Sequence, residues 1–145
     1  MTKLLDILNE SIEVAEDGQH GYKTAMESVK TDSLKKMFAE SSHQREKFVS
    51  ELKDKVKTLG EVSTEHGSIK STIHRAWINI KSLVTNADEV AILVECVNGD
   101  KVAIETYERN LKEELPSDVR LLLNDQLTNI KTAYSKLLQL ENVKK

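Results

Sequence analysis

Hydrophobic residues recur every three or four positions along most of this chain, which is the pattern of amphipathic helices that bury one face. The first such segment runs from about Thr2 to Val29, with apolar positions at Leu4, Leu8, Ile12, Ala15, Tyr22, Met26 and Val29. The second follows Thr31-Asp32-Ser33, whose side-chain oxygens are candidates to cap a helix N-terminus. It ends at Gly60, a residue suited to the left-handed conformation after a helix.

A third helix is predicted from about Ala87 to Glu114, with Asn86 as its cap, because Pro116 cannot extend a helix and restricts the residue before it. Ser117 is predicted to cap a fourth helix, with apolar positions at Val119, Leu122, Leu123, Ile130, Ala133, Tyr134 and Leu137. No strand-like alternation, internal repeat or low-complexity linker interrupts these segments. We therefore predict an all-α four-helix bundle that forms one domain over residues 1–145.

The connection between the second and third helices, about residues 60–86, has a different character. Residues 61–67 are polar, whereas a one-sided helix follows, with apolar positions at Ile69, Ile73, Ala76, Trp77, Ile80, Leu83 and Val84. A segment of this length can travel the length of a bundle. The third helix can then run parallel to the second, which is ferritin-like connectivity. The alternative is an additional helix that covers one end of the bundle.

Composition narrows the class of protein. The 145 residues suffice for one core, and 21 basic against 24 acidic residues give a net charge of −3, which excludes an overall electrostatic footprint for nucleic acid. No stretch approaches the roughly 20 apolar residues of a membrane span, and the first residues do not resemble a signal peptide, so we expect a cytoplasmic protein. The single cysteine, Cys96, excludes an intramolecular disulfide, and its apolar position favours a core residue over a reactive thiol.

Several short runs occur in a characteristic order: Glu16-Asp17-Gly18 with Gly21-Tyr22, His43-Gln44-Arg45-Glu46, His74-Arg75-Ala76-Trp77, and Glu95-Cys96 with Gly99-Asp100. Together they resemble a bacterial family of ferritin-like four-helix-bundle proteins, largely described as a domain of unknown function. The resemblance extends to about Leu137. Two positions depart from the family pattern, since Val97 stands where a second glutamate is frequent and Tyr134 where a histidine is frequent. The resemblance implies the fold and leaves the function open.

Ferritin-like di-iron and di-manganese proteins draw carboxylates and Glu-x-x-His pairs from their helices into the bundle. The run from Glu40 to His43 has this spacing, and the other available ligands are Glu13, Glu16, Glu46 and Glu95. At about 100° per residue, however, His43 falls opposite the buried stripe of its helix, and Glu40 lies roughly 120° from that stripe. We therefore predict no metal cofactor. A di-iron or di-manganese site is the alternative, which a kink at a helical glycine would favour.

Polar residues interrupt the predicted buried stripes near their midpoints. They are Ser41, Arg45, Asp100 and Gln126, together with the inward tyrosines Tyr22, Tyr107 and Tyr134. Because an unpaired buried charge is strongly unfavourable, we predict that Arg45 pairs with Asp100, and that Gln126 or a tyrosine completes the hydrogen bonds. The alternative is that Arg45 reaches water along its aliphatic stem. At Gly18 and Gly21 we expect either the close approach of another helix or a local bend.

The helix predicted from Ile69 to Val84 combines Trp77 on its apolar stripe with a basic polar face that contains Lys70, His74, Arg75 and Lys81. Such a helix suits an anionic membrane surface or a partner helix. Packing of the stripe on the bundle is the simpler prediction. The sequence as a whole favours a non-enzymatic structural or interaction protein that binds a second copy or another protein. The alternative is a di-metal oxidase or metal-storage protein.

Overall fold

A computed structural model describes residues 2–60 and 88–144 of the chain. These residues form four helices, α1 (Thr2–Ser28), α2 (Asp32–Thr58), α4 (Glu89–Asn110) and α5 (Ser117–Lys144). The prediction of an all-α four-helix fold is confirmed, and the described ranges contain no strand. The predicted helix from Ile69 to Val84 lies outside the described residues, as do its proposed surface residues Lys70, His74, Arg75, Trp77 and Lys81.

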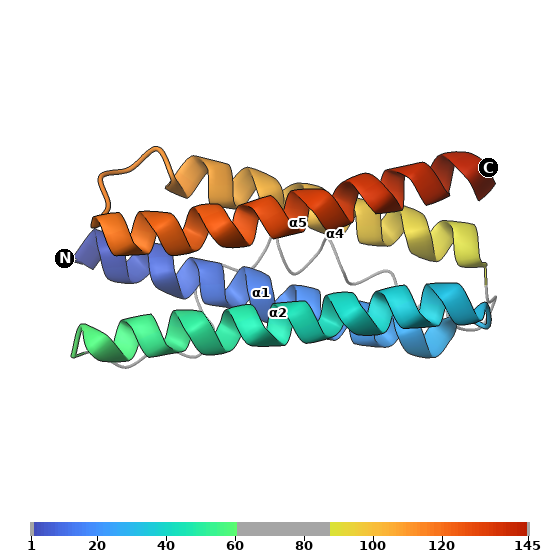
Figure 1. The fold of residues 1–145 in the computed structure, drawn as a ribbon, viewed down its shortest axis with the longest axis horizontal. Helices are drawn as coiled ribbons and strands as arrows, with labels where there is room; N and C mark the ends of the chain where they lie inside the picture. Colours follow the sequence, from blue (N-terminus) through green and yellow to red (C-terminus); the bar gives the residue numbers. More distant parts are fainter. Residues whose placement is uncertain (1, 61–87, 145) are drawn as a thin grey trace.

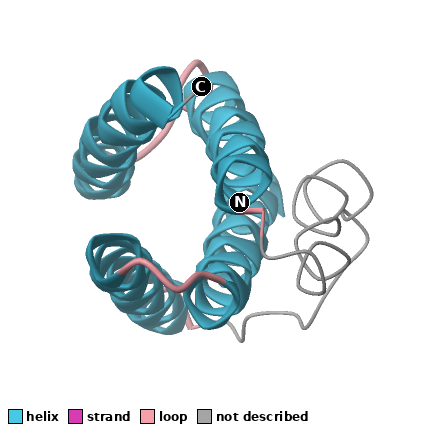
Figure 2. Cartoon of the chain, turned by 90° about the vertical axis from the view of Figure 1, so that its right-hand side faces the viewer, coloured by secondary structure: helices cyan, strands magenta, loops and turns pink. Residues whose placement is uncertain are grey.

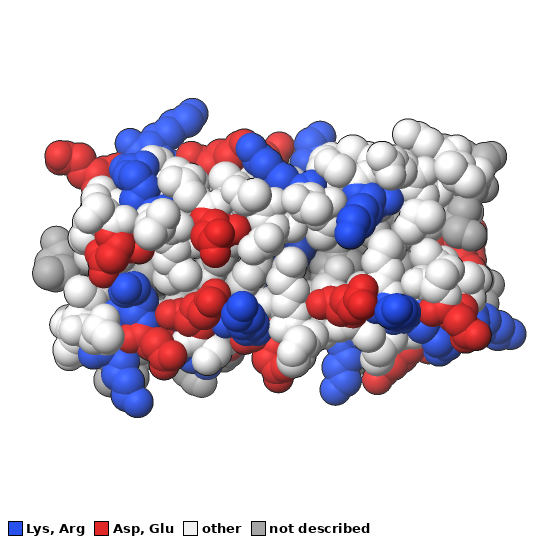
Figure 3. Space-filling view, viewed as in Figure 1, with Lys and Arg blue, Asp and Glu red and all other residues white. Residues whose placement is uncertain are grey.

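The helices form two antiparallel hairpins, α1 with α2 and α4 with α5 (Figure 1). The end of α2 and the start of α4 lie at opposite ends of the bundle, and these two helices run in the same direction (Figure 1). Contacts are dense within each hairpin and between α1 and α4, whereas α2 and α5 approach each other at few points (Figure 2). The face formed by α2 and α5 carries interspersed acidic and basic side chains (Figure 3).

The start of α4 is fastened to the turn between α1 and α2 by Glu89. Its carboxylate accepts hydrogen bonds from the backbone N–H groups of Lys30 and Thr31, at 2.8 and 3.0 Å, and from the Thr31 hydroxyl at 2.6 Å. Of the three predicted cap candidates, Thr31 is the N-cap of α2, but its side chain makes no capping bond to its own helix. The N–H groups of Lys30 and Thr31, just before α2, thus bind a residue of the other hairpin.

Two other helix starts differ from the sequence predictions. α4 begins at Glu89 rather than Ala87, and its cap is Asp88, whose side chain accepts a hydrogen bond from the Ala91 N–H at 3.2 Å. The predicted cap Asn86 lies outside the described residues. Ser117 is the first residue of α5 and not its cap, because Pro116 already supplies the first helical carbonyl, which accepts from the N–H of Arg120 at 3.0 Å.

The helix ends agree with the sequence in one case and differ in another. Gly60 has a φ of 78°, so the left-handed residue predicted after α2 is confirmed. α4 ends at Asn110 and not at Glu114, and turn hydrogen bonds from the N–H groups of Lys112 and Glu113 follow it. No helix among the described residues is long and apolar enough to cross a membrane.

The apolar core is divided along the bundle axis. One cluster gathers around Leu8, Ile12 and Leu52, and the other gathers around Phe38 and Leu34. The first half draws on the beginning of α1 and the end of α2, and the second half draws on the opposite ends of these helices. The buried polar side chains of Arg45 and Asp100 lie near the midpoints of α2 and α4, between the two halves.

Candidate functional site

A buried ion pair joins α2 to α4 at this middle level. The side chains of Arg45 and Asp100 are only 1% and 0% exposed. Arg45 Nη1 donates to Asp100 Oδ1 at 2.8 Å, and Nη2 donates to Oδ2 at 3.2 Å, so the contact is bidentate. The structure therefore brings together the two inward charged residues that the sequence analysis predicts to pair. The alternative in which the Arg45 side chain reaches water is wrong.

Tyr22 of α1 completes the hydrogen bonding of this pair. Its hydroxyl donates to Asp100 Oδ2 at 2.5 Å, and its ring lies under the guanidinium, with Arg45 Cζ 5.2 Å from the ring centroid. The remaining direction of the guanidinium is used by Nε, which donates to Gln44 Oε1 at 3.1 Å. Burial raises the pKa of Tyr22 well above its usual value, and the Asp100 charge raises it further while Arg45 lowers it. The tyrosine therefore remains a neutral donor to the carboxylate.

The close approach expected at Gly18 is made by the Arg45 side chain. A Cβ atom at Gly18 would lie 2.9 Å from Arg45 Nη1 and 3.4 Å from its Cγ. The helix α1 is continuous through Gly18 and Gly21. The absence of a side chain at Gly18 thus leaves room for the Arg45 side chain to pass α1 and reach Asp100.

A second polar network lies two helical turns further along α4 from Asp100. The Tyr107 hydroxyl donates to Gln126 Oε1 at 2.7 Å, and Gln126 Nε2 donates to Glu51 Oε1 at 3.1 Å. Tyr107 and Gln126 are each 1% exposed, and burial is the main cause that raises the pKa of Tyr107. Gln126 therefore does not complete the Arg45–Asp100 pair. Of the two possibilities that the sequence leaves open, a glutamine or a tyrosine, the tyrosine is the partner.

Two other residues predicted for the polar centre lie outside it. Ser41 is half-buried and lines a groove of about 190 Å³ between α2 and α5, together with Gln44 and Lys136. Tyr134 is half-buried and packs at the edge of the apolar half that contains Phe38. Helical phase gives the direction of these side chains but not their depth.

Cys96 lies one helical turn before Asp100 and is fully buried. Burial raises the pKa of its thiol well above the usual value, and the charge of Asp100 raises it further. A thiol that remains protonated is a poor nucleophile and a poor metal ligand. This environment agrees with the expectation of a core residue.

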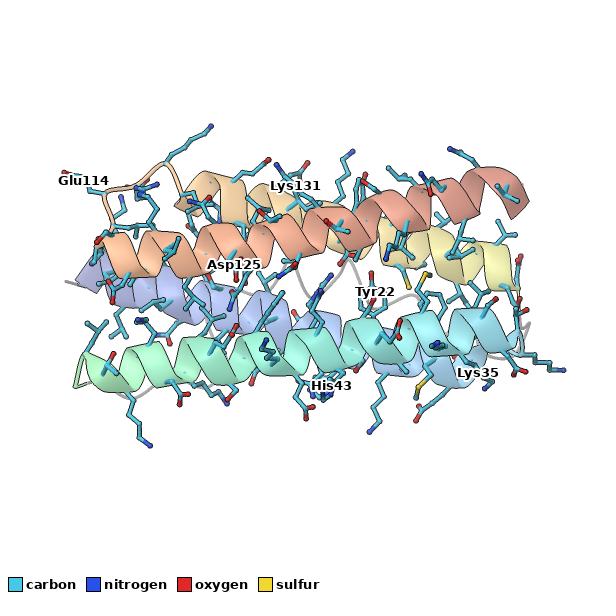
Figure 4. The ribbon with its side chains drawn as sticks, in the orientation of Figure 1. Tyr22, Lys35, His43, Glu114, Asp125 and Lys131 are labelled. Atoms are coloured by element: carbon cyan, nitrogen blue, oxygen red, sulfur yellow. The ribbon has the colours of Figure 1, made fainter. Side chains whose placement is uncertain are left out.

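The candidate metal ligands are dispersed over the described helices and do not form one group. His43 points away from the bundle, whereas Tyr22 lies between the helices (Figure 4). The His43 side chain is 84% exposed and lies 3.4 Å from Glu46, which is 62% exposed, and Glu40 is also exposed. Glu13, Glu16 and Glu95 are half-buried. Within residues 2–60 and 88–144, no three His, Cys, Asp or Glu side chains come together in a group that could hold a metal ion.

Two residues of these networks escape the sequence analysis. Gln44 accepts a hydrogen bond from its chain neighbour Arg45, and Glu51 accepts one from Gln126 across the bundle. Glutamine beside a buried arginine is a weak local signal for the first contact. The second contact joins residues 75 positions apart and has no local signal.

The sequence from residue 3 to residue 113 matches a family model whose description is Domain of unknown function (DUF2383). The matched region contains Gly18, Tyr22, Arg45 and Asp100, and it ends before α5 begins. Among curated proteins, none is similar enough to this chain to be counted as a relative.

Replacing Arg45 by methionine is expected to lower the free energy of unfolding by about 3–5 kcal/mol, because Asp100 is then left charged and unpaired in the core. Replacing both partners, as Arg45→Met with Asp100→Leu, is expected to recover most of the loss. Urea denaturation followed by circular dichroism measures both effects, with exposed Lys47→Met as the control. If Arg45→Met lowered the free energy of unfolding by less than about 1 kcal/mol, the ion pair would not be buried as described.

The effect of Gly18→Ala is expected to change sign with the residue at position 45. In the wild type the new methyl group would meet the Arg45 guanidinium, which is held by Asp100, so the substitution destabilises the fold. In the Arg45→Met background the same substitution is expected to stabilise, because alanine favours a helix over glycine by about 1 kcal/mol. Thermal or urea unfolding of the four variants tests this, and equal effects in the two backgrounds would refute the steric explanation.

Stability is expected to fall with rising pH above about 10, where the tyrosines of the unfolded chain ionise. Tyr22 and Tyr107 keep their protons to higher pH in the folded state, so each adds a slope of up to about 1.4 kcal/mol per pH unit. Urea unfolding between pH 9 and 11 measures the slope. It should be shallower in Tyr107→Phe than in the wild type, and an unchanged slope would show that this phenol titrates alike in both states.

Proposed function

Since the chain belongs to the family DUF2383, whose description assigns no function, we propose its function from the geometry of the core. It is a non-enzymatic structural or interaction protein built on a ferritin-like bundle. An ion pair between Arg45 and Asp100 occupies the middle of that bundle, where ferritin-like di-metal proteins hold their cations.

The course of the helices supports the ferritin-like part of this proposal. Two hairpins in which the second and third main helices run parallel require a long connection between opposite ends of the bundle. The parallel course of α2 and α4 agrees with this requirement (Figure 1). The 28 residues between Gly60 and Glu89 are long enough for such a connection, even at the short helical rise of about 1.5 Å per residue.

The observation that carries the proposal is the bidentate contact between Arg45 and Asp100. Asp100 is the single fully buried carboxylate in the described ranges, and the guanidinium and the Tyr22 hydroxyl already bind both of its oxygens. A cation at this level would have to displace the arginine and would feel its positive charge at short range. The same contact supports a non-catalytic role, because it uses the buried polar groups to hold helices together.

The partner in this proposal is a second copy or another protein in the cytoplasm. The net charge of −3 speaks against nucleic acid, whose binding is dominated by basic contacts to phosphate. The arrangement of the described carboxylates gives no separate support for a di-metal oxidase or storage protein. A metal count distinguishes this alternative from the proposal.

Ferrous iron or Mn²⁺ is added anaerobically in excess to the purified protein, unbound metal is removed by desalting, and the metal per chain is counted by mass spectrometry. Far less than one ion per chain is expected, because the inward carboxylate is already paired. The control is the variant Glu40→Gln with His43→Gln, which should give the same count. About two ions per chain, lost in this variant, would replace the proposal by a di-metal function.

A further inference from the structure

One outward strip of α5 carries hydrophobic ends and opposite charges. It consists of Leu121, Asp125, Thr132, Lys136 and Val143, and we refer to it as the α5 strip. Eleven residues separate Thr132 from Leu121 on one side and from Val143 on the other. Since eleven residues make slightly more than three full helical turns, these positions lie on one face. Asp125 and Lys136 fall on the same face, two turns before and one turn after the central threonine.

The ends of the strip are unusually hydrophobic for surface positions. Leu121 and Val143 are 72% and 81% exposed, and they are the exposed large hydrophobic residues in the described part of the chain. Thr132 and Lys136 line the groove between α2 and α5. The strip therefore borders the pair of neighbouring helices that has the fewest mutual contacts. Asp125 projects from the same side of α5, whereas Lys131 projects towards α4 (Figure 4) and pairs with Glu108 at 2.9 Å.

The strip is complementary to its own reversed copy. Rotation by 180° about an axis through Thr132 places Leu121 against the partner's Val143. The same rotation brings Asp125 within one helical turn of the partner's Lys136, and this contact occurs twice. Self-complementarity of this kind is what an interface with two-fold symmetry requires. A parallel arrangement would instead oppose Asp125 to Asp125 and Lys136 to Lys136.

We propose that two copies of this chain associate through antiparallel packing of their α5 strips. Neither Asp125 nor Lys136 makes an ion pair with any other residue of the described ranges. The hydroxyls of Thr128 and Thr132 donate to the carbonyls of Asn124 and Thr128, at 2.9 and 3.1 Å. These hydroxyl groups therefore keep a hydrogen-bond partner when a dimer interface excludes water from the centre of the strip.

This inference rests on the proposed function, since it names the partner of an interaction protein as a second copy. The contact between one pair of helices is small compared with stable dimer interfaces, which bury at least about 1,200 Å². A dissociation constant in the micromolar range or weaker is therefore expected. The metal count described above tests the proposed function independently, because a monomeric chain without metal would overturn only the α5 pairing.

Sedimentation velocity of the full chain over a range of concentrations tests the pairing. The wild type should dimerise, and Asp125→Lys or Lys136→Asp should each weaken the dimer about tenfold or more, because two attractive contacts become repulsive. The double variant Asp125→Lys with Lys136→Asp should return close to the wild-type affinity. Lys101→Asp, an exposed charge reversal on α4, is the matched control and should leave the affinity unchanged.

A cysteine at the symmetry axis gives an independent measurement. Thr132→Cys should form an intermolecular disulfide under mild oxidation, while Lys101→Cys should not, and the native Cys96 is fully buried and does not compete. A wild type that remains monomeric at millimolar concentration would overturn the proposal. A dimer that is insensitive to charge reversal at Asp125 and Lys136, or that the double variant fails to restore, would overturn it as well.

Discussion

The contact between the guanidinium of Arg45 and the carboxylate of Asp100 is the interaction on which the rest of the structure depends. It connects α2 with α4, the two helices that run in the same direction but are far apart along the chain. Because both groups are almost completely buried, the bundle can hold them only if each finds the other at the correct height. The pair therefore sets the axial register of one hairpin against the other, while the apolar clusters on either side supply the general attraction.

An ion pair in this position is not explained by stability alone. Apolar residues of similar volume are frequently as stabilising as a buried pair, whereas a single unpaired charge is very unfavourable. What the pair contributes is discrimination, because a bundle displaced by one helical turn would leave both charges without partners. Two largely aliphatic half-cores lack this property, since leucine and isoleucine side chains accept many neighbours. A similar role is served by Glu89, which recognises the turn between α1 and α2 and so fixes one end of the bundle.

Much of this architecture is readable from the sequence, because helical phase persists along uninterrupted helices of more than twenty residues. Phase alone identifies Arg45 and Asp100 as inward and Glu40 and His43 as outward, and the structure places these four side chains accordingly. Phase does not give depth or partner. It predicts that Gln126 faces inward but not that this glutamine serves Tyr107. The hydrogen bonds from Thr31 and Lys30 to Glu89 join residues 58 and 59 positions apart, and the early end of α4 depends on the turn that follows it.

The space at Gly18 has a consequence for how this protein can change during evolution. A side chain at position 18 and an arginine at position 45 compete for the same volume, so the two sites are epistatic. An evolving lineage that replaces the glycine first must pass through a strained intermediate. A lineage that exchanges the arginine and its aspartate first encounters no such barrier, and the glycine then becomes dispensable. The order of substitutions is thereby constrained, and the ancestry of a relative with alanine at this site should include the earlier loss of the arginine.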